Sequence, residues 1–322
     1  MKVTIPDDYQ GAVETLDCFA TLAGHDVTVH RDAVTDLDAL AERFHETEAL
    51  VLIRERTRLS RALVERLPTL RLVAQTGRGI PHIDVEACTE HGVVVTTGGG
   101  SPVAPAELTW GLVLAARRHI AREAASVRAG GWQTALGSEL AGTTLGIYGY
   151  GSIGALVARY GGAFDMRVVA AGREGSRSRA AADGVEVVTR EALFREADVL
   201  SLHLKLTDET RGIVGPGDLA SMKPSALLVN TARAGLIEPG ALAEALAHGR
   251  PGDAAVDVFD QEPVPAGDTL VARENALCTP HIGYVTREAY ELYFGQAFAQ
   301  VNDFAAGAPT GIVTPDALRR QG

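Results

Sequence analysis

Three short segments of this 322-residue chain each place a chemically active side chain just after a predicted buried strand. Arg233 lies in NTARAG, Glu262 in DVFDQEP and His281 in TPHIG. The fork of an arginine binds a carboxylate and an adjacent carbonyl oxygen. A histidine that is oriented by a carboxylate exchanges a proton near neutral pH. Together these residue types fit acid/base chemistry on a small carboxylic acid.

Each of the three side chains, taken alone, also fits a structural role. Arg233 could cap a helix, Glu262 could be a solvated loop acid, and His281 could be a turn residue after Pro280. Position favours the chemical role, because ligands of open α/β sheets bind outside the carboxyl ends of the strands.

A glycine-rich turn predicts where a nucleotide cofactor binds. The apolar run 145–148 leads into GYGSIG, and a helical pattern follows at once. Glycines in this order permit a tight turn, close approach of a pyrophosphate and close helix–strand packing. The amides and dipole of the helix start then bind the phosphate. A tight turn without a ligand is the alternative. The expected cofactor contacts here are Gly149, Gly151, Ser152, Ile153 and Gly154.

Strand and helix patterns alternate along almost the whole chain, which predicts parallel sheets covered by helices. We expect strands at 2–5, 27–30, 49–53, 72–75, 93–96, 145–148, 168–171, 199–203, 226–230, 254–258 and 276–279. We expect helices at 35–44, 60–66, 85–91, from 102 toward 119, and at 287–306.

The fold class predicted from this pattern is α/β, with two doubly wound parallel-sheet lobes. A Rossmann dinucleotide-binding domain, residues 101–284, is inserted into a flavodoxin-like substrate domain made of residues 1–100 and 285–322. A cleft between the lobes is where substrate and cofactor are expected to meet.

Composition limits the classes of partner. A net charge of -11 argues against a nucleic-acid or anionic-membrane surface. The longest apolar run, 108–116, is too short to span a bilayer, and the first residues lack the apolar core of a secretion signal, so we expect a cytoplasmic protein. Three widely separated cysteines predict no disulfide framework. No spacing of Cys and His residues predicts a metal site.

The ordered set GYGSIG, NTARAG, DVFDQEP and TPHIG, with GRGIPHID upstream, resembles the D-isomer-specific 2-hydroxyacid dehydrogenases, among them phosphoglycerate dehydrogenases and hydroxypyruvate/glyoxylate reductases. The resemblance covers nearly the whole chain. It implies hydride transfer between a nicotinamide cofactor and a 2-oxo or D-2-hydroxy acid. It assigns the acid/base to His281, its support to Glu262, and substrate binding and polarisation to Arg233.

The resemblance also implies further contacts. Asp257 matches the residue that holds the nicotinamide carboxamide, and His203 and Thr231 lie at other strand ends of the cofactor lobe. The backbone at Arg78 and Gly79 matches the loop that receives the substrate carboxylate.

Two further features stay open at this stage. Arg54, in IRERTR, is a candidate for a second anionic group of the substrate; an internal Arg–Glu pair in a solvated loop is the alternative. The helix from Pro102 and its extension to Trp132 resemble the dimerising region of the family, so a homodimer is expected.

The turn after the strand at 168–171 bears on the choice of cofactor. A site for NAD normally places an acid there, to bind the ribose 2′-hydroxyl. This chain has Gly172 and Arg173, with Arg177 nearby, which suits a 2′-phosphate. Glu174 could still reach the ribose. We expect NAD(P), with NADP(H) favoured.

Two other functions remain possible. One is a non-catalytic, NAD(P)(H)-responsive binding or corepressor protein of the same fold. The other is a dehydrogenase for an unusual hydride donor such as formate or phosphite. Glu262 beside His281 fits the hydroxyacid branch better, since the formate branch has glutamine there.

Overall fold

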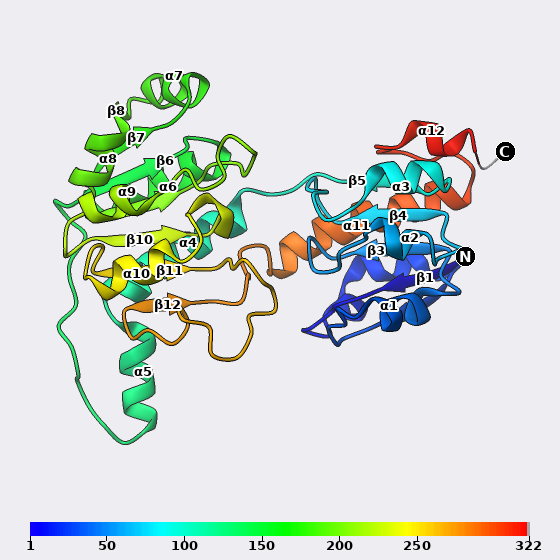
Figure 1. Cartoon of the computed structure of the whole chain (residues 1–322), viewed down its shortest axis with the longest axis horizontal. Helices are drawn as coiled ribbons and strands as arrows, with labels where there is room; N and C mark the ends of the chain where they lie inside the picture. Colours follow the sequence, from blue (N-terminus) through cyan, green and yellow to red (C-terminus); the bar gives the residue numbers. More distant parts are fainter. Residues whose placement is uncertain (321–322) are drawn as a thin grey trace. The chain divides into compact units, whose positions relative to one another are not determined.

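The computed structural model describes residues 1–320, which form two compact units (Figure 1). Unit 1 comprises Met1–Ser101 and the described part of Val285–Gly322, and unit 2 is Pro102–Tyr284. Residues 321 and 322, which the sequence assigns to the first lobe, lie outside the described residues.

Unit 1 contains a five-stranded parallel sheet in the order β2-β1-β3-β4-β5. This is the 2-1-3-4-5 order of flavodoxin-like folds. The four residues of β3 and the four of β4 are all buried, as expected for strands covered on both faces. The strands are β1 (Lys2–Ile5), β2 (Asp26–Val29), β3 (Ala49–Leu52), β4 (Leu72–Gln75) and β5 (Val94–Thr97). The helices are η1 (Val13–Thr15), η2 (Asp17–Leu22), α1 (Leu37–Phe44), α2 (Arg61–Val64), α3 (Val85–Glu90), α11 (Arg287–Ala305) and α12 (Pro315–Leu318).

The last part of the chain completes unit 1. Helix α11 packs on η2 and β4 and buries Phe294 and Phe298. The chain then returns to the edge of the sheet, where the Val313 N–H donates to the Val95 carbonyl at 2.8 Å. The Val95 N–H in turn donates to Thr314 Oγ1 at 2.8 Å. The segment after α11 is therefore part of the core structure of this unit.

Unit 2 contains a seven-stranded sheet in the order β12-β11-β10-β9-β6-β7-β8, with every neighbouring pair parallel. When β6 is numbered as strand 1 and the sheet is read from β8, the order is 3-2-1-4-5-6-7. This is the dinucleotide-binding order with one strand added. The strands are β6 (Thr144–Tyr148), β7 (Arg167–Ala171), β8 (Glu186–Val187), β9 (Val199–Leu202), β10 (Leu227–Asn230), β11 (Asp253–Val256) and β12 (Ala276–Cys278). The helices are α4 (Val103–Arg117), α5 (Ile120–Arg128), α6 (Ser152–Ala163), α7 (Glu174–Ala182), α8 (Arg190–Glu196), α9 (Pro216–Ser221), η3 (Ala234–Leu236) and α10 (Ala241–Ala247). The predicted α/β class with two parallel sheets is confirmed.

Helices α4 and α5 differ in their surroundings. Helix α4 packs on α6, β10 and β11, and its Trp110 contacts the rings of Tyr160 and Phe164. Helix α5 projects from unit 2 in Figure 1 and buries none of its residues. A helix without a buried face gains little from packing within its own chain.

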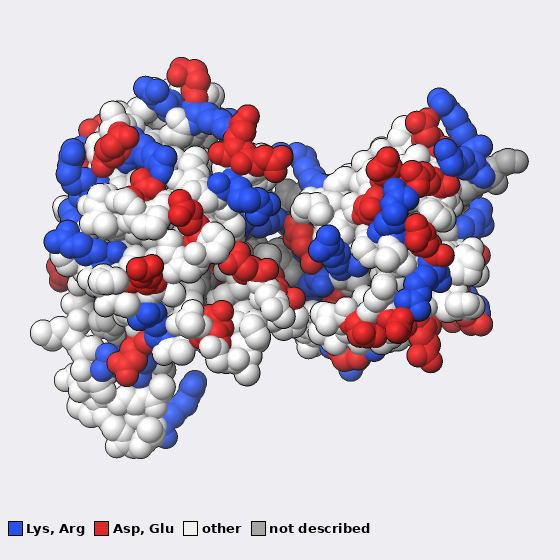
Figure 2. Space-filling view, in the orientation of Figure 1, with Lys and Arg blue, Asp and Glu red and all other residues white. Residues whose placement is uncertain are grey.

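The surface carries both signs of charge. On the face drawn in Figure 2, acidic and basic side chains are interspersed over each unit. Within residues 1–320, no helix is both long enough and apolar enough to cross a membrane.

Candidate active site

The chemically active residues of unit 2 all follow strands of one parallel sheet. His281 follows β12, Asp257 and Glu262 follow β11, and Arg233 follows β10, three strands that are neighbours in the sheet. Parallel strands end at the same edge, so these residues share one edge of unit 2.

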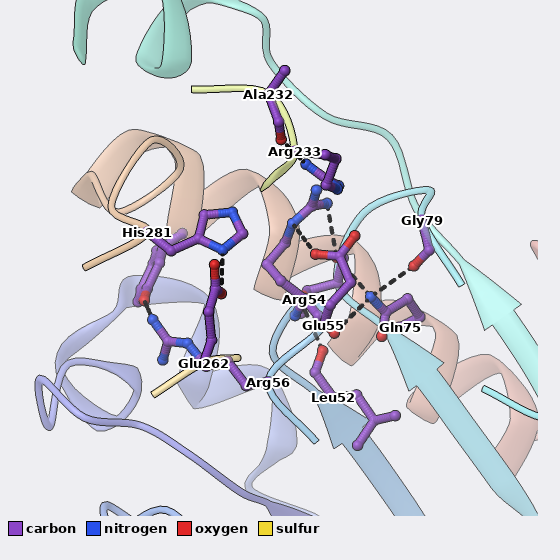
Figure 3. Close-up of polar contacts among 12 residues, drawn as sticks. Leu52, Arg54, Glu55, Arg56, Gln75, Gly79, Ala232, Arg233, Glu262 and His281 are labelled. Carbon is purple, nitrogen blue, oxygen red and sulfur yellow. Dashed lines mark hydrogen bonds and ion pairs between the residues drawn. The ribbon is translucent and has the colours of Figure 1, made fainter. Parts of the chain in front are cut away.

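His281 and Glu262 form a direct pair. The Nδ1 atom of His281 lies 2.6 Å from Glu262 Oε2, and Figure 3 shows the imidazole facing the carboxylate. The other carboxylate oxygen, Oε1, accepts a hydrogen bond from the Phe259 N–H at 2.9 Å, which fixes its orientation. The Tyr284 ring packs edge-on against the imidazole, with 5.4 Å between ring centroids. Because Nδ1 is engaged by the carboxylate, Nε2 is the nitrogen left for exchange of a proton with a ligand.

Asp257 ties down the loop that carries His281. Its buried carboxylate accepts from Thr279 Oγ1 at 2.6 Å and from the Ile282 N–H at 2.9 Å on Oδ1, and from the Gly283 N–H at 2.8 Å on Oδ2. Burial raises the pKa of Asp257, and the three donors act against that rise. The sequence does not reveal this role, because an acid after a strand fits contact with a ligand equally well.

Arg233 lies in a loop whose backbone is fixed by Asn230. The Asn230 amide donates to the Arg233 carbonyl at 3.0 Å and accepts from the Ala232 N–H at 3.1 Å. The guanidinium donates to the Ala232 carbonyl at 2.7 Å (Figure 3). The buried Asn230 is thus a positioning residue that the sequence analysis missed, although it is the last residue of a predicted strand.

The glycine-rich turn has the shape that a pyrophosphate requires. Gly149 has φ = 100°, and a Cβ there would lie 2.8 Å from the His203 carbonyl carbon. A Cβ on Gly154 would lie 2.5 Å from the Gly149 carbonyl oxygen, so this glycine allows α6 to pack on the turn. By contrast, a Cβ on Gly151 would meet no atom within 4 Å, which leaves open space at the start of the helix. No side chain caps α6, and the amides of its first turn have no acceptor within the helix, as in other anion-binding helix starts. The residues present therefore fit a dinucleotide.

His203 and Thr231 have defined partners in unit 2. Ser201 Oγ and His203 Nε2 lie 2.9 Å apart, and burial lowers the pKa of His203 to about 4, so the ring is neutral near pH 7. Thr231 Oγ1 lies 2.6 Å from Oγ1 of Thr109 on α4. Both residues lie at the strand-end edge, where the sequence predicts the cofactor to bind.

A cavity of about 500 Å³ lies beyond the ends of β6, β7 and β8. Arg173 and Arg177 line it, and Arg173 Nη2 also pairs with Glu209 Oε2 at 2.6 Å. The sequence identified Gly172 and the two arginines but not Glu209 or the rest of the lining. The other lining residues are Tyr148, Ala171, Gly172, Val187, Val188, Thr189, Arg190, Glu191, Leu204, Thr210 and Ile213.

In unit 1, Arg54 and Gly79 belong to two loops that one buried glutamine joins. The Gln75 Nε2 donates to the carbonyls of Arg54 and Gly79, at 3.0 Å each (Figure 3). The Arg54 N–H donates to Thr76 Oγ1 at 2.9 Å. Arg78, the residue before Gly79, is exposed and lines a separate cavity of about 590 Å³ with residues 97–99 and Gln296.

The structure describes no candidate metal centre. Among residues 1–320, no group of three or more His, Cys, Asp or Glu side chains could hold a metal ion.

Comparison with known proteins gives consistent relatives. The family model "D-isomer specific 2-hydroxyacid dehydrogenase, NAD binding domain" matches residues 110–283. A glyoxylate reductase of Aeropyrum pernix is 39% identical over 293 residues, which is 88% of this chain and 87% of that protein. A D-3-phosphoglycerate dehydrogenase of Methanocaldococcus jannaschii is 40% identical over 256 residues, 78% of this chain but only 48% of that longer protein. The crystal structure of a phosphoglycerate oxidoreductase from Vibrio cholerae superposes with a TM-score of 0.93 at 48% identity, covering 96% of this chain and all of that one.

Proposed function

This chain belongs to the D-isomer specific 2-hydroxyacid dehydrogenase family, and on that premise we propose that it transfers a hydride between a nicotinamide cofactor and C2 of a 2-oxo or D-2-hydroxy acid. The observation that carries the proposal is the pair formed by His281 Nδ1 and Glu262 Oε2 at 2.6 Å. A carboxylate in that position holds the imidazole in one orientation and stabilises its protonated form.

His281 is the proposed acid/base of the reaction. In the reducing direction its Nε2 donates a proton to the substrate oxygen as C2 accepts the hydride. Glu262 stabilises the imidazolium before the transfer and orients the neutral ring after it.

Arg233 is the proposed substrate anchor and electrophile. Its guanidinium binds the substrate carboxylate and the C2 oxygen, and it stabilises the charge that develops on that oxygen. The backbone at Arg78 and Gly79 is proposed to receive the substrate carboxylate, and Asn230 and Asp257 to position the catalytic loops.

The cofactor is proposed to bind along the strand-end edge of unit 2, and when bound it supplies or accepts the hydride. The turn and helix start at Gly149, Gly151, Ser152, Ile153 and Gly154 would hold the pyrophosphate. His203, Thr231 and Asp257 would line the nicotinamide side. Arg173 and Arg177 would face the ribose, where their charge favours NADP(H).

A panel assay tests the proposal. Reduction of 2-oxo acids, including glyoxylate and hydroxypyruvate, is followed by loss of reduced-nicotinamide absorbance with NADH and with NADPH. We expect turnover of at least one member of the panel and a product of D configuration. Tight cofactor binding without turnover of any member would instead favour the non-catalytic, cofactor-responsive binding protein.

We further propose that the protein is a homodimer that buries α5 and the segment after it. Four large apolar side chains are exposed there: Ile120 at 52%, Val127 at 56%, Trp132 at 73% and Leu136 at 96%. Such a concentration marks an interaction surface. The mass from light scattering of wild-type protein and of Val127→Asp tests it, and a monomeric wild type would refute it.

A further inference from the structure

Tyr150 is the second residue of the glycine-rich turn, and the proposed cofactor contacts of that turn do not include it. Only 3% of this residue is exposed, and it belongs to the apolar cluster of unit 2 that also contains Val157 and Ala180. A side chain this buried acts on a cofactor only through the groups that it holds in place. The hydrogen bonds of Tyr150 show which groups these are.

Tyr150 binds helix α7 at both of its ends. The Tyr150 backbone N–H donates to Oγ of Ser176, in the first turn of α7, at 2.5 Å. The phenol hydroxyl donates to Oδ2 of Asp183, the C-terminal cap residue of α7, at 3.0 Å. Burial and the Asp183 carboxylate raise the pKa of Tyr150 to about 12, so the hydroxyl stays a donor at neutral pH. One residue of the turn thus joins the turn to the whole length of the helix.

Helix α7 has little apolar packing of its own. It lies at the β8 edge of the unit 2 sheet (Figure 1), and Ala180 is its only buried residue. A helix with one small buried side chain gains little stability from packing, so the polar contacts at its ends matter more. Gly172 permits the first of these contacts, because a Cβ there would lie 2.8 Å from Ser176 Oγ. An acid in place of Gly172, as sites for NAD normally have, would displace Ser176 from the turn.

The same contacts fix the start of α7, where two arginines lie. Arg173 is the N-cap residue, and its carbonyl accepts from the Ser176 N–H at 2.9 Å and from the Arg177 N–H at 3.0 Å. Arg173 and Arg177 both line the cavity beyond the ends of β6, β7 and β8. A continuous path of hydrogen bonds therefore leads from the turn to the arginines, through the Ser176 hydroxyl and the Ser176 backbone.

We propose that Tyr150 is a positioning residue for the cofactor: it holds α7 against the glycine-rich turn, keeps Arg173 and Arg177 in place for a ribose 2′-phosphate, and so determines how strongly NADP(H) is preferred over NAD(H). Binding is stronger where the groups that contact a ligand are held in place before it arrives, because less conformational entropy is lost. The inference rests on the proposed function, which assigns the pyrophosphate to the turn and the 2′-phosphate to the two arginines.

Two fragments of the cofactor separate the contribution of the turn from that of the arginines. Adenosine 2′,5′-bisphosphate carries a phosphate for each, whereas 5′-AMP carries only the phosphate for the turn. Calorimetry measures both dissociation constants for wild type, Tyr150→Phe and Ser176→Ala. We expect each variant to bind the bisphosphate about 3- to 10-fold more weakly, through loss of one hydrogen bond, and to bind 5′-AMP nearly as wild type does. Tyr160→Phe, which removes a tyrosine hydroxyl from α6, is the matched control and should change neither constant.

A combined substitution tests whether Tyr150 acts through the arginines. In a protein that carries both Arg173→Ala and Arg177→Ala, Tyr150→Phe should no longer alter the ratio of the two dissociation constants. Ser176→Ala keeps the buried ring and serves alone should Tyr150→Phe not fold. An unchanged ratio in both single variants, an undiminished effect without the arginines, or a wild type that binds the two fragments equally overturns the inference. None of these results depends on turnover, so the panel assay with NADH and NADPH tests the dehydrogenase proposal separately.

Discussion

The carboxylate of Asp257 accepts a hydrogen bond from the Gly283 N–H at 2.8 Å, two residues beyond His281. Together with the bonds from Thr279 and Ile282, it holds the loop after β12 on both sides of the imidazole. Three donors converge on one buried anion, and an uncharged amide cannot accept from all three without opposing one of them.

Asp257→Asn is therefore expected to loosen the catalytic loop. We expect a loss of about 1–3 kcal/mol in the free energy of unfolding and a fall of about 10- to 100-fold in kcat. Urea unfolding and steady-state kinetics measure the two effects. Thr279→Val removes only one donor and should have the smaller effect in both measurements. Equal stability of Asp257→Asn and wild type would show that these bonds do not hold the loop.

The strands were predictable from sequence because most of them are buried and parallel. Their apolar runs are continuous, and β1 and β4 have the predicted bounds while β11 and β12 end one or two residues early. Strand β8 was missed because it has only two residues, Glu186 and Val187, one of them polar. The pairing of residues 312–314 with β5 was missed because it joins segments more than 200 residues apart, which no local pattern reveals.

The residue types of the site could be predicted from the sequence, but the hydrogen-bond and ion-pair partners of these residues could not. The strand-end positions of Arg233, Glu262 and His281 follow from the apolar runs before them, and the His–Glu pair was expected and is present in the structure. The bonds of Asp257 and the pairing of Arg54 with Glu55 depend on where the loops turn, which the spacing of residues does not determine. Arg54 Nε lies 3.9 Å from Glu55 Oε2 in a largely buried loop, and a role of Arg54 toward a second anionic group of the substrate stays a prediction.

His281→Ala tests the proposed acid/base directly. Loss of the proton donor should lower kcat by about 10²- to 10⁴-fold, while the dissociation constant of the cofactor stays unchanged. Glu262→Gln keeps an acceptor near Nδ1 but removes its charge, so a smaller fall in kcat is expected. Stopped-flow or steady-state assays give kcat, and fluorescence titration gives cofactor binding. Activity close to wild type in His281→Ala would exclude this residue from the mechanism.

Substitutions at Arg173 and Glu209 test the expected preference for NADP(H) over NAD(H). Arg173→Ala should raise the dissociation constant of NADPH by about 10-fold and leave that of NADH nearly unchanged, because a charge-assisted contact with the 2′-phosphate is lost. Glu209→Gln should tighten NADPH binding by only a few-fold, because the pair with Arg173 is exposed. Calorimetry measures both, with Arg195→Ala, an exposed arginine on α8, as control. Tighter binding of NADH than of NADPH by wild type would reverse the preference.

His203 makes stability depend on pH in a defined window. Burial lowers its pKa from 6.5 to about 4 in the folded chain, so between these values the unfolded chain binds more protons than the folded one. The contribution of His203 to stability is therefore complete above pH 6.5 and is lost progressively as the pH falls toward 4, amounting to at most about 3 kcal/mol. His203→Gln can keep a hydrogen bond to Ser201 but does not titrate, so its free energy of unfolding should fall less than that of wild type over the same range. Other groups, including Asp257, titrate in both proteins, so the difference between the two urea-unfolding series isolates His203. Parallel curves for the two proteins would mean that the imidazole is solvated enough to take up a proton in the folded state.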